Sequence, residues 1–309
     1  MDLLPDHNWR VTSNLHANHG PGPEQWVLLN LWFQEHLAGR EQNIPKTPPS
    51  TFRIENGRAH FSVIPSSLDR LVETEIYYSY DPNCVTRFWK RASATKKGDT
   101  WKANFKVQSK LPLYVFALCR FKLAEEAVLE RGNTTMTFTL NSQLHSHIPG
   151  DIDLSAIAKL SKSGLLDNFS RGIGNWSSRD QSSIKTYKFQ DPELDTSSGN
   201  KLVLHFNLKK DQALLLGLSA ESKFLGNGRD LGSFHYGRRI AGDGPKSIVL
   251  TTGDFKSNDS KALEWSKIST FSISLTDQKT KRKIKLTDLE TRKVLERIEL
   301  VSEGKKIER

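Results

Sequence analysis

The stretch Trp101-Lys-Ala-Asn-Phe-Lys-Val107 alternates apolar with polar residues, which is the period of a β-strand with one buried face. Turn residues separate it from similar stretches, among them Asn56-Gly57, a dipeptide typical of two-residue hairpins. Six more short stretches are rich in aromatic or β-branched residues: 52–54, 60–64, 75–80, 86–89, 113–118 and 134–140. About seven short strands in one block predict an immunoglobulin-like β-sandwich over residues 46–144.

A second β-rich block follows, over residues 164–303. Gly-rich segments at 226–228 and 242–244 separate its strands and are expected to be loops. Many strands joined by long loops favour a jelly roll. We expect a polar linker at 145–163 between the two blocks, with His145 and His147 as linker histidines. A basic tail at 304–309 follows the second block. The expected strands are 184–189, 201–208, 213–218, 246–251, 270–275, 283–286 and 296–300.

The first 45 residues predict a different arrangement: a strand at Trp9–Ser13, a Gly- and Pro-rich loop at 16–23, and a helix over Glu24–Leu37. The helix is apolar around most of its circumference, so we expect it to be buried on more than one side. Either it docks on the sandwich that follows, or another chain covers it. The fold class is therefore mainly β, with two consecutive sandwiches after a strand–helix segment.

Composition narrows the classes of protein. The 309 residues include fifteen Phe and seven Trp, enough for packed cores, and the formal net charge is +10. No apolar run is long enough to span a membrane, and the N-terminus has no signal-peptide pattern. Two cysteines allow at most one disulfide and exclude a disulfide framework. The basic runs at 279–285 and 305–309 lack interleaved aromatic residues, so we expect no nucleic-acid partner.

One segment resembles a known family. Asn14-Leu-His-Ala-Asn-His-Gly20, followed by Trp26 to Gly39, resembles the C-terminal end of α/β-hydrolases, closest to the dienelactone-hydrolase-like and PhoPQ-activated-type enzymes. The resemblance implies that His19 occupies the position of the catalytic-triad histidine and that the protein is exported, although its N-terminus leaves the localisation unassigned. It also implies that the strand–loop–helix segment 1–45 is the remnant of a hydrolase.

A triad histidine needs a serine and a carboxylate that precede it in this fold. Only eighteen residues precede His19, and no Gly-x-Ser-x-Gly motif occurs anywhere. We therefore expect a chain that is not active by itself, a non-catalytic accessory or glycan-binding module. The alternative is the C-terminal piece of a serine esterase or peptidase that supplies His19 to an upstream hydrolase chain.

The two β blocks carry resemblances as well. Tyr77-Tyr-Ser79-x-Asp81 and Arg87-Phe-Trp-Lys90 resemble the region after the catalytic domain of the PhoPQ-activated-type enzymes. Core packing is their expected role, and surface recognition is the alternative. The second block resembles galactose-binding-like jelly rolls of carbohydrate-binding modules. The residues that carry this likeness are 166–176, with Trp176, together with 253–255 and 263–268, with Trp265. Both tryptophans either close the ends of the sandwich or contact sugar.

Candidate binding residues lie in the polar stretch 227–239. Arg229, Tyr236 and Arg238 combine an aromatic ring with planar hydrogen-bonding groups, which a sugar-binding loop needs. We therefore predict a polysaccharide partner.

No metal or other cofactor is expected from the sequence. His16 and His19 lack a third ligand at suitable spacing. A structural Ca²⁺ held by Asp167, Asp254 and Asp259 is the one alternative.

Overall fold

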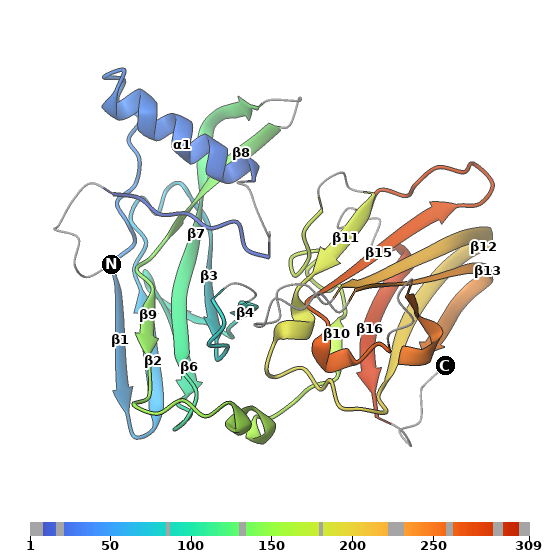
Figure 1. Ribbon diagram of the computed structural model, residues 1–309. Coiled ribbons are helices and arrows are strands. Elements are labelled where there is room, and N and C mark those ends of the chain that lie inside the picture. Colours follow the sequence, from blue (N-terminus) through green and yellow to red (C-terminus); the bar gives the residue numbers. More distant parts are fainter. Residues whose placement is uncertain are drawn as a thin grey trace. The chain divides into compact units, whose positions relative to one another are not determined.

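The computed structural model describes residues 9–16, 22–84, 87–129, 134–178, 182–221, 232–257, 262–286 and 293–302 (Figure 1). The described residues are mainly antiparallel β-structure with an α-helix near the N-terminus, which confirms the expected fold class. The chain divides into two compact units. Unit 1 contains residues 1–82 and 89–156, and unit 2 contains 83–88 and 157–309. In the part of the chain that is described, no helix is long and apolar enough to cross a membrane.

Unit 1 is a sandwich of two antiparallel sheets. One sheet has the strand order β1-β2-β6-β5, and the other has the order β4-β3-β7-β8. If the strands are lettered A, B, C, C′, D, E, F and G along the chain, these orders are A-B-E-D and C′-C-F-G, as in an immunoglobulin-like fold. The strands are β1 (Ser50–Glu55), β2 (Arg58–Val63), β3 (Leu71–Ser79), β4 (Lys90–Arg91), β5 (Thr95–Lys97), β6 (Thr100–Lys106), β7 (Leu113–Val128) and β8 (Thr134–Asn141).

Local chemistry fixes the first hairpin as the sequence predicts. Asn56 and Gly57 both have positive φ, 50° and 71°, as a type I′ turn requires. The turn places Glu55 opposite Arg58 and sets the register of β1 on β2. With that register, alternate residues of β2 and β6 are buried against the second sheet: Ala59, Phe61, Val63, Ala103 and Phe105.

The predicted polar linker begins inside unit 1. Residues 145–147 form strand β9 (His145–His147), which pairs with the start of β7. His145 is half-buried: its Nε2 lies 2.9 Å from Ser50 Oγ, and its ring stacks on Phe52 at 5.8 Å between centroids. His145 is thus a packing residue rather than a solvated linker histidine.

Helix α1 (Pro23–His36) docks on unit 1, the first of the two alternatives raised by its apolar sequence (Figure 1). Val27 and Leu28 are buried in a cluster with Phe121, Phe138 and Leu140 of β7 and β8. The opposite side of α1 stays exposed in the described chain, so the expectation of burial on several sides is not met there. The exposed apolar residues are Trp26, Leu29, Phe33 and Leu37.

The segment before α1 is extended but forms no strand, contrary to the prediction for Trp9–Ser13. It lies along β8, where the Asn141 amide donates to the Val11 carbonyl at 2.7 Å and the Thr12 and Thr139 hydroxyls are 2.7 Å apart. Backbone and side-chain hydrogen bonds together therefore hold this segment on β8, in place of the regular backbone ladder of a strand.

Unit 2 is built around two long strands, β12 (Lys201–Glu221) and β13 (Ser233–Leu250), which pair along their whole length. The first half of β12 also pairs with β16, and the second half pairs with β15. The other strands are β10 (Leu165–Asp167), β11 (Ser183–Thr186), β14 (Lys256–Ser257), β15 (Thr270–Asp277) and β16 (Leu295–Val301). Short 3-10 helices are η2 (Leu154–Lys159, at the border with unit 1), η3 (Lys188–Gln190), η4 (Thr252–Asp254) and η5 (Trp265–Lys267).

A bulge turns this hairpin through a corner. The register of β12 on β13 shifts between Leu208 and Gln212, where Asp211 has φ 58° and Gly242 and Gly244 of β13 also have positive φ. The sequence predicted a strand break and a loop here. Both strands continue instead, and the alternate residues of β12 on either side of the bulge enter one core: Leu202, Leu204, Phe206, Leu208, Leu214, Leu216, Leu218 and Ala220.

Trp176 and Trp265 are core residues, which settles the choice left open by the sequence. Their side chains are buried, and each indole N–H donates to an internal acceptor at 2.7 Å: Asp167 Oδ2 for Trp176 and the Asn200 carbonyl for Trp265. Neither ring is available to a sugar.

The two cysteines are both free, Cys84 exposed and Cys119 buried. Burial raises the pKa of the Cys119 thiol to about 12, against the smaller opposing effect of the hydrogen bond from Thr74. Since the thiolate is the reactive form, we expect one thiol per chain to react with a disulfide reagent at pH 8 and the second only after unfolding. Thiol counting with Cys84→Ser as control checks this; rapid labelling of two native thiols would contradict the burial of Cys119.

Candidate functional site

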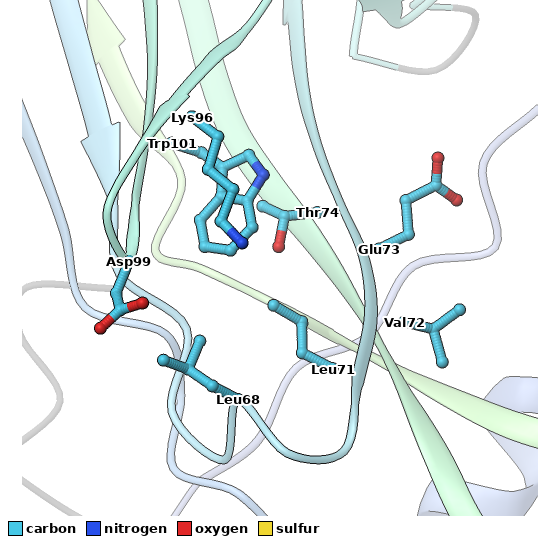
Figure 2. A pocket seen from close by; sticks show the side chains of 8 residues that line it. All are labelled: Leu68, Leu71, Val72, Glu73, Thr74, Lys96, Asp99 and Trp101. Atoms are coloured by element: carbon cyan, nitrogen blue, oxygen red, sulfur yellow. The ribbon is translucent and has the colours of Figure 1, made fainter.

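A half-open pocket of about 310 Å³ lies in unit 1, between the β5–β6 hairpin and the start of β3 (Figure 2). This volume is at the lower end of the range for small-ligand sites. We call it the Trp101 pocket. The residues that line it are Leu68, Leu71, Val72, Glu73, Thr74, Lys96, Asp99 and Trp101.

One wall comes from the β5–β6 hairpin. Trp101 continues the inward-facing series of Ala103 and Phe105 but lies at the end of the sheet, so its ring is only half-buried. Lys96 is directly opposite on β5, and its ammonium lies 4.6 Å from the indole centroid, a cation–π contact. Asp99, in the two-residue turn, adds an exposed carboxylate to the rim.

The opposite wall comes from β3 and the turn before it. A register shift between Leu71 and Glu73 makes Val72 the extra residue of a bulge. As a result Leu71 and Thr74 point toward Trp101, whereas Val72 and Glu73 point away (Figure 2). The pocket therefore lies between this bulged start of β3 and the β5–β6 hairpin.

Two lining residues are already engaged in the fold. The hydroxyl of Thr74 donates to Cys119 Sγ at 3.7 Å. Glu73 accepts from Arg120 at 2.7 Å and from Arg91 at 3.3 Å. These bonds hold the β3 wall in place. The groups that remain for a ligand are the indole face that Lys96 does not cover, the N–H groups of the Lys96 ammonium and the carboxylate of Asp99.

This set of groups fits binding better than bond cleavage. The eight lining residues include no histidine, serine or cysteine, and the hydroxyl of Thr74 is already bonded to Cys119. An aromatic face with charged groups at its rim fits a flat ligand that has one apolar face and several polar substituents. A saccharide ring has that character.

The structure does not join the residues predicted to bind sugar into a loop. Tyr236 and Arg238 lie in strand β13, opposite Leu218 and Leu216 of β12, so the predicted binding loop is a strand from Ser233 onward. Tyr236 is half-buried against the core, with its ring 5.9 Å from that of Phe255, and Arg238 is exposed. Alternation of buried Phe234 and Ile240 with exposed residues explains the strand. Arg229 lies outside the described residues.

His19 also lies outside the described residues, so its role in an upstream hydrolase stays a prediction. The carboxylates proposed for calcium have local partners. Asp167 accepts from Trp176 and from the Phe169 amide, and Asp254 accepts from Thr251 in an N-terminal cap. Asp259 is not described. Within the described ranges, no three His, Cys, Asp or Glu residues are grouped as a metal site would require.

Sequence reasoning placed Trp101 in a strand and assigned no function to the pocket. The available signal is local: a tryptophan that follows the Gly98-Asp99 turn, with Lys96 and Lys97 before the turn. What the sequence could not show is that Leu71 and Thr74 come to face this hairpin, since a bulge and a sheet-to-sheet contact create that approach.

Comparisons with known proteins add little. No family model matches the sequence, and no curated protein matches it. Among solved structures, a similar chain comes from work on the promiscuous specificity of carbohydrate-binding modules of the β-sandwich superfamily. It is 9% identical, the alignment covers 85% of this chain and 100% of that one, and the TM-score is 0.25. At that score the likeness supports no statement about the ligand of this protein.

Proposed function

We propose that this protein is a non-catalytic, glycan-binding accessory protein and that the Trp101 pocket holds one saccharide ring. The observation that carries the proposal is the half-buried indole at an open rim, with the ammonium of Lys96 over one face of its ring and the carboxylate of Asp99 at the rim. The ring face packs on the apolar side of the sugar. The charged groups bond its hydroxyls, and the sheets hold the indole in place, so little ordering cost arises on binding.

Substitution of Trp101 by Ala tests the proposal. We expect the variant to lose about two- to tenfold in affinity, because a stacked aromatic contact contributes roughly 0.5–1.5 kcal/mol and tenfold is about 1.4 kcal/mol. Affinity electrophoresis through gels that contain neutral and acidic polysaccharides measures the loss. Trp101→Phe keeps an aromatic face and should retain most of the binding.

The matched control is Trp26→Ala, which removes an exposed tryptophan from α1 and leaves the pocket intact. It should bind as the natural protein does. Equal retention of Trp101→Ala and Trp26→Ala, or no retention of the natural protein by any polysaccharide in the panel, would contradict the proposed function.

A further inference from the structure

The outer face of the four-stranded sheet in unit 1 carries an excess of positive charge. In strands whose alternate residues face the core, the other residues face solvent. Register places directly opposite residues on the same side, so Lys102 shares its face with Ser62 and Thr95, and Lys106 shares its face with Arg58. We call this the β1-β2-β6-β5 face. Its cationic residues are Arg53, Arg58, Lys97, Lys102 and Lys106.

Most of this charge is not neutralised. Glu55 is the one carboxylate contributed by these strands, and it pairs with Arg53 at 3.3 Å, both side chains being more than half exposed. Arg58, Lys102 and Lys106 are exposed and have no ion-pair partner among the described residues. A face with such an excess of positive charge raises the local concentration of polyanions.

The cations are spread along the face. Lys102 and Lys106 are four residues apart on β6, which is about 13 Å at the usual rise of a strand. Arg58 lies beside Lys106, one strand away, at about 4.8 Å. A ligand that engages both ends must therefore carry negative charges repeatedly along an extended chain. A single phosphate or carboxylate would reach only one end.

Between the two cationic ends lie uncharged hydrogen-bonding groups. His60 Nδ1 and Asn104 Oδ1 are 2.7 Å apart in the middle of the face. The Thr51 and Ser62 hydroxyls are also 2.7 Å apart, and they lie level with Lys102 at one cationic end. Amide, imidazole and hydroxyl groups bond sugar hydroxyls well. The strands place no Phe, Tyr or Trp on this face, since Phe52, Phe61, Trp101 and Phe105 belong to the inward-facing series.

We infer that the β1-β2-β6-β5 face binds a linear acidic polysaccharide, with carboxylates or sulfates against the cations and hydroxyls against the row between them. Single-stranded nucleic acid is disfavoured, because its binding relies on aromatic stacking. Four strands side by side are also too wide for a DNA major groove, which accepts a helix or a two-stranded ribbon. The inference rests on the proposed glycan binding only for the choice of a saccharide, and it uses other residues than the Trp101 pocket.

The test is the triple variant Arg58→Gln, Lys102→Gln, Lys106→Gln. Its matched control is Lys209→Gln, Lys210→Gln, Lys279→Gln, which removes the same charge from exposed positions of unit 2. Retention is measured in gels that contain polygalacturonate, heparin or neutral dextran, and dissociation constants are measured as a function of salt. An oligothymidine is the nucleic-acid competitor.

We expect gels that contain polygalacturonate or heparin to retain the natural protein through this face. Dextran should not bind to this face. The triple variant should lose at least tenfold in affinity, and its log–log salt slope should fall by about 2, at roughly 0.7 per neutralised contact. The unit 2 control should bind normally. Carboxylate- and sulfate-bearing chains are distinguished by which gel retains the protein.

The inference is overturned by equal losses in the two triple variants, by tighter binding of oligothymidine than of either acidic polysaccharide, or by no retention at low salt. A protein in which Trp101→Ala abolishes binding while the cationic triple variant does not would keep the proposed function and lose the inference. The reverse result would keep the cationic face and lose the pocket.

Discussion

Replacement of Asp167 by Ala lowers the free energy of unfolding of unit 2 by an expected 3–5 kcal/mol or so, since each buried donor left without an acceptor costs about 1–3 kcal/mol. The buried carboxylate of Asp167 accepts three bonds: from Trp176 Nε1 at 2.7 Å, from the Phe169 amide at 2.8 Å and from Asn175 Nδ2 at 3.2 Å. The ring of Phe169 also stacks on that of Trp176. Urea unfolding, followed by tryptophan fluorescence and circular dichroism, measures the change.

Asp254→Ala is the control for this prediction. The Asp254 carboxylate accepts two hydrogen bonds, from the amide and hydroxyl of Thr251 at 2.7 and 2.8 Å. These bonds lie at an exposed cap, where water can replace the carboxylate as acceptor. We expect a loss of about 1 kcal/mol there. Asp167→Asn should fall between the two, since one acceptor oxygen remains. Similar losses for Asp167→Ala and Asp254→Ala would show that burial of the acceptor is not what matters.

Phe121→Ala is expected to destabilise unit 1 by about 3–5 kcal/mol, the usual cost of removing a large buried aromatic side chain. Phe121 is fully buried, and its ring stacks on that of Phe138 with 5.7 Å between centroids. Both rings lie in the cluster that receives Val27 and Leu28, so the cavity would open beneath α1. Thermal unfolding measures the loss, and limited proteolysis should show earlier cleavage within α1.

The control for Phe121→Ala is Met136→Ala on β8, whose side chain is about two-fifths exposed. Surface substitutions of this kind usually change stability by less than about 0.5 kcal/mol. If Phe121→Ala melts like Met136→Ala, or leaves the cleavage of α1 unchanged, the helix is not held by this cluster.

Where strands are short and bounded by turn residues, the sequence predicts unit 1 well. Asn56-Gly57 predicts a hairpin because only a few residue types tolerate two positive φ angles in succession, and the structure has that hairpin. The sequence of unit 2 predicts its strands less well. The polar run from Lys209 to Gln212 has the composition of a loop, yet the neighbouring strands supply enough backbone bonds to carry β12 through it as a bulge.

The candidate site escapes prediction for a related reason. Tyr236 and Arg238 were attractive because their residue types suit sugars, but half of that stretch is strand, and Tyr236 packs on Phe255. Trp101 was unremarkable in the sequence because its exposure depends on where the opposite sheet ends. Residue chemistry is local, whereas an open rim arises from how two sheets are matched in length and register.

The bent hairpin of β12 and β13 gives unit 2 a mechanical property. The first half of β12 pairs with β16 and its second half with β15, while β13 pairs with both halves, so neither β15 nor β16 can separate from β12 without breaking part of the same backbone ladder. Amide hydrogens on both sides of the Leu208–Gln212 corner should therefore exchange with solvent deuterium as one block, and a stretching force should rupture the unit in a single step.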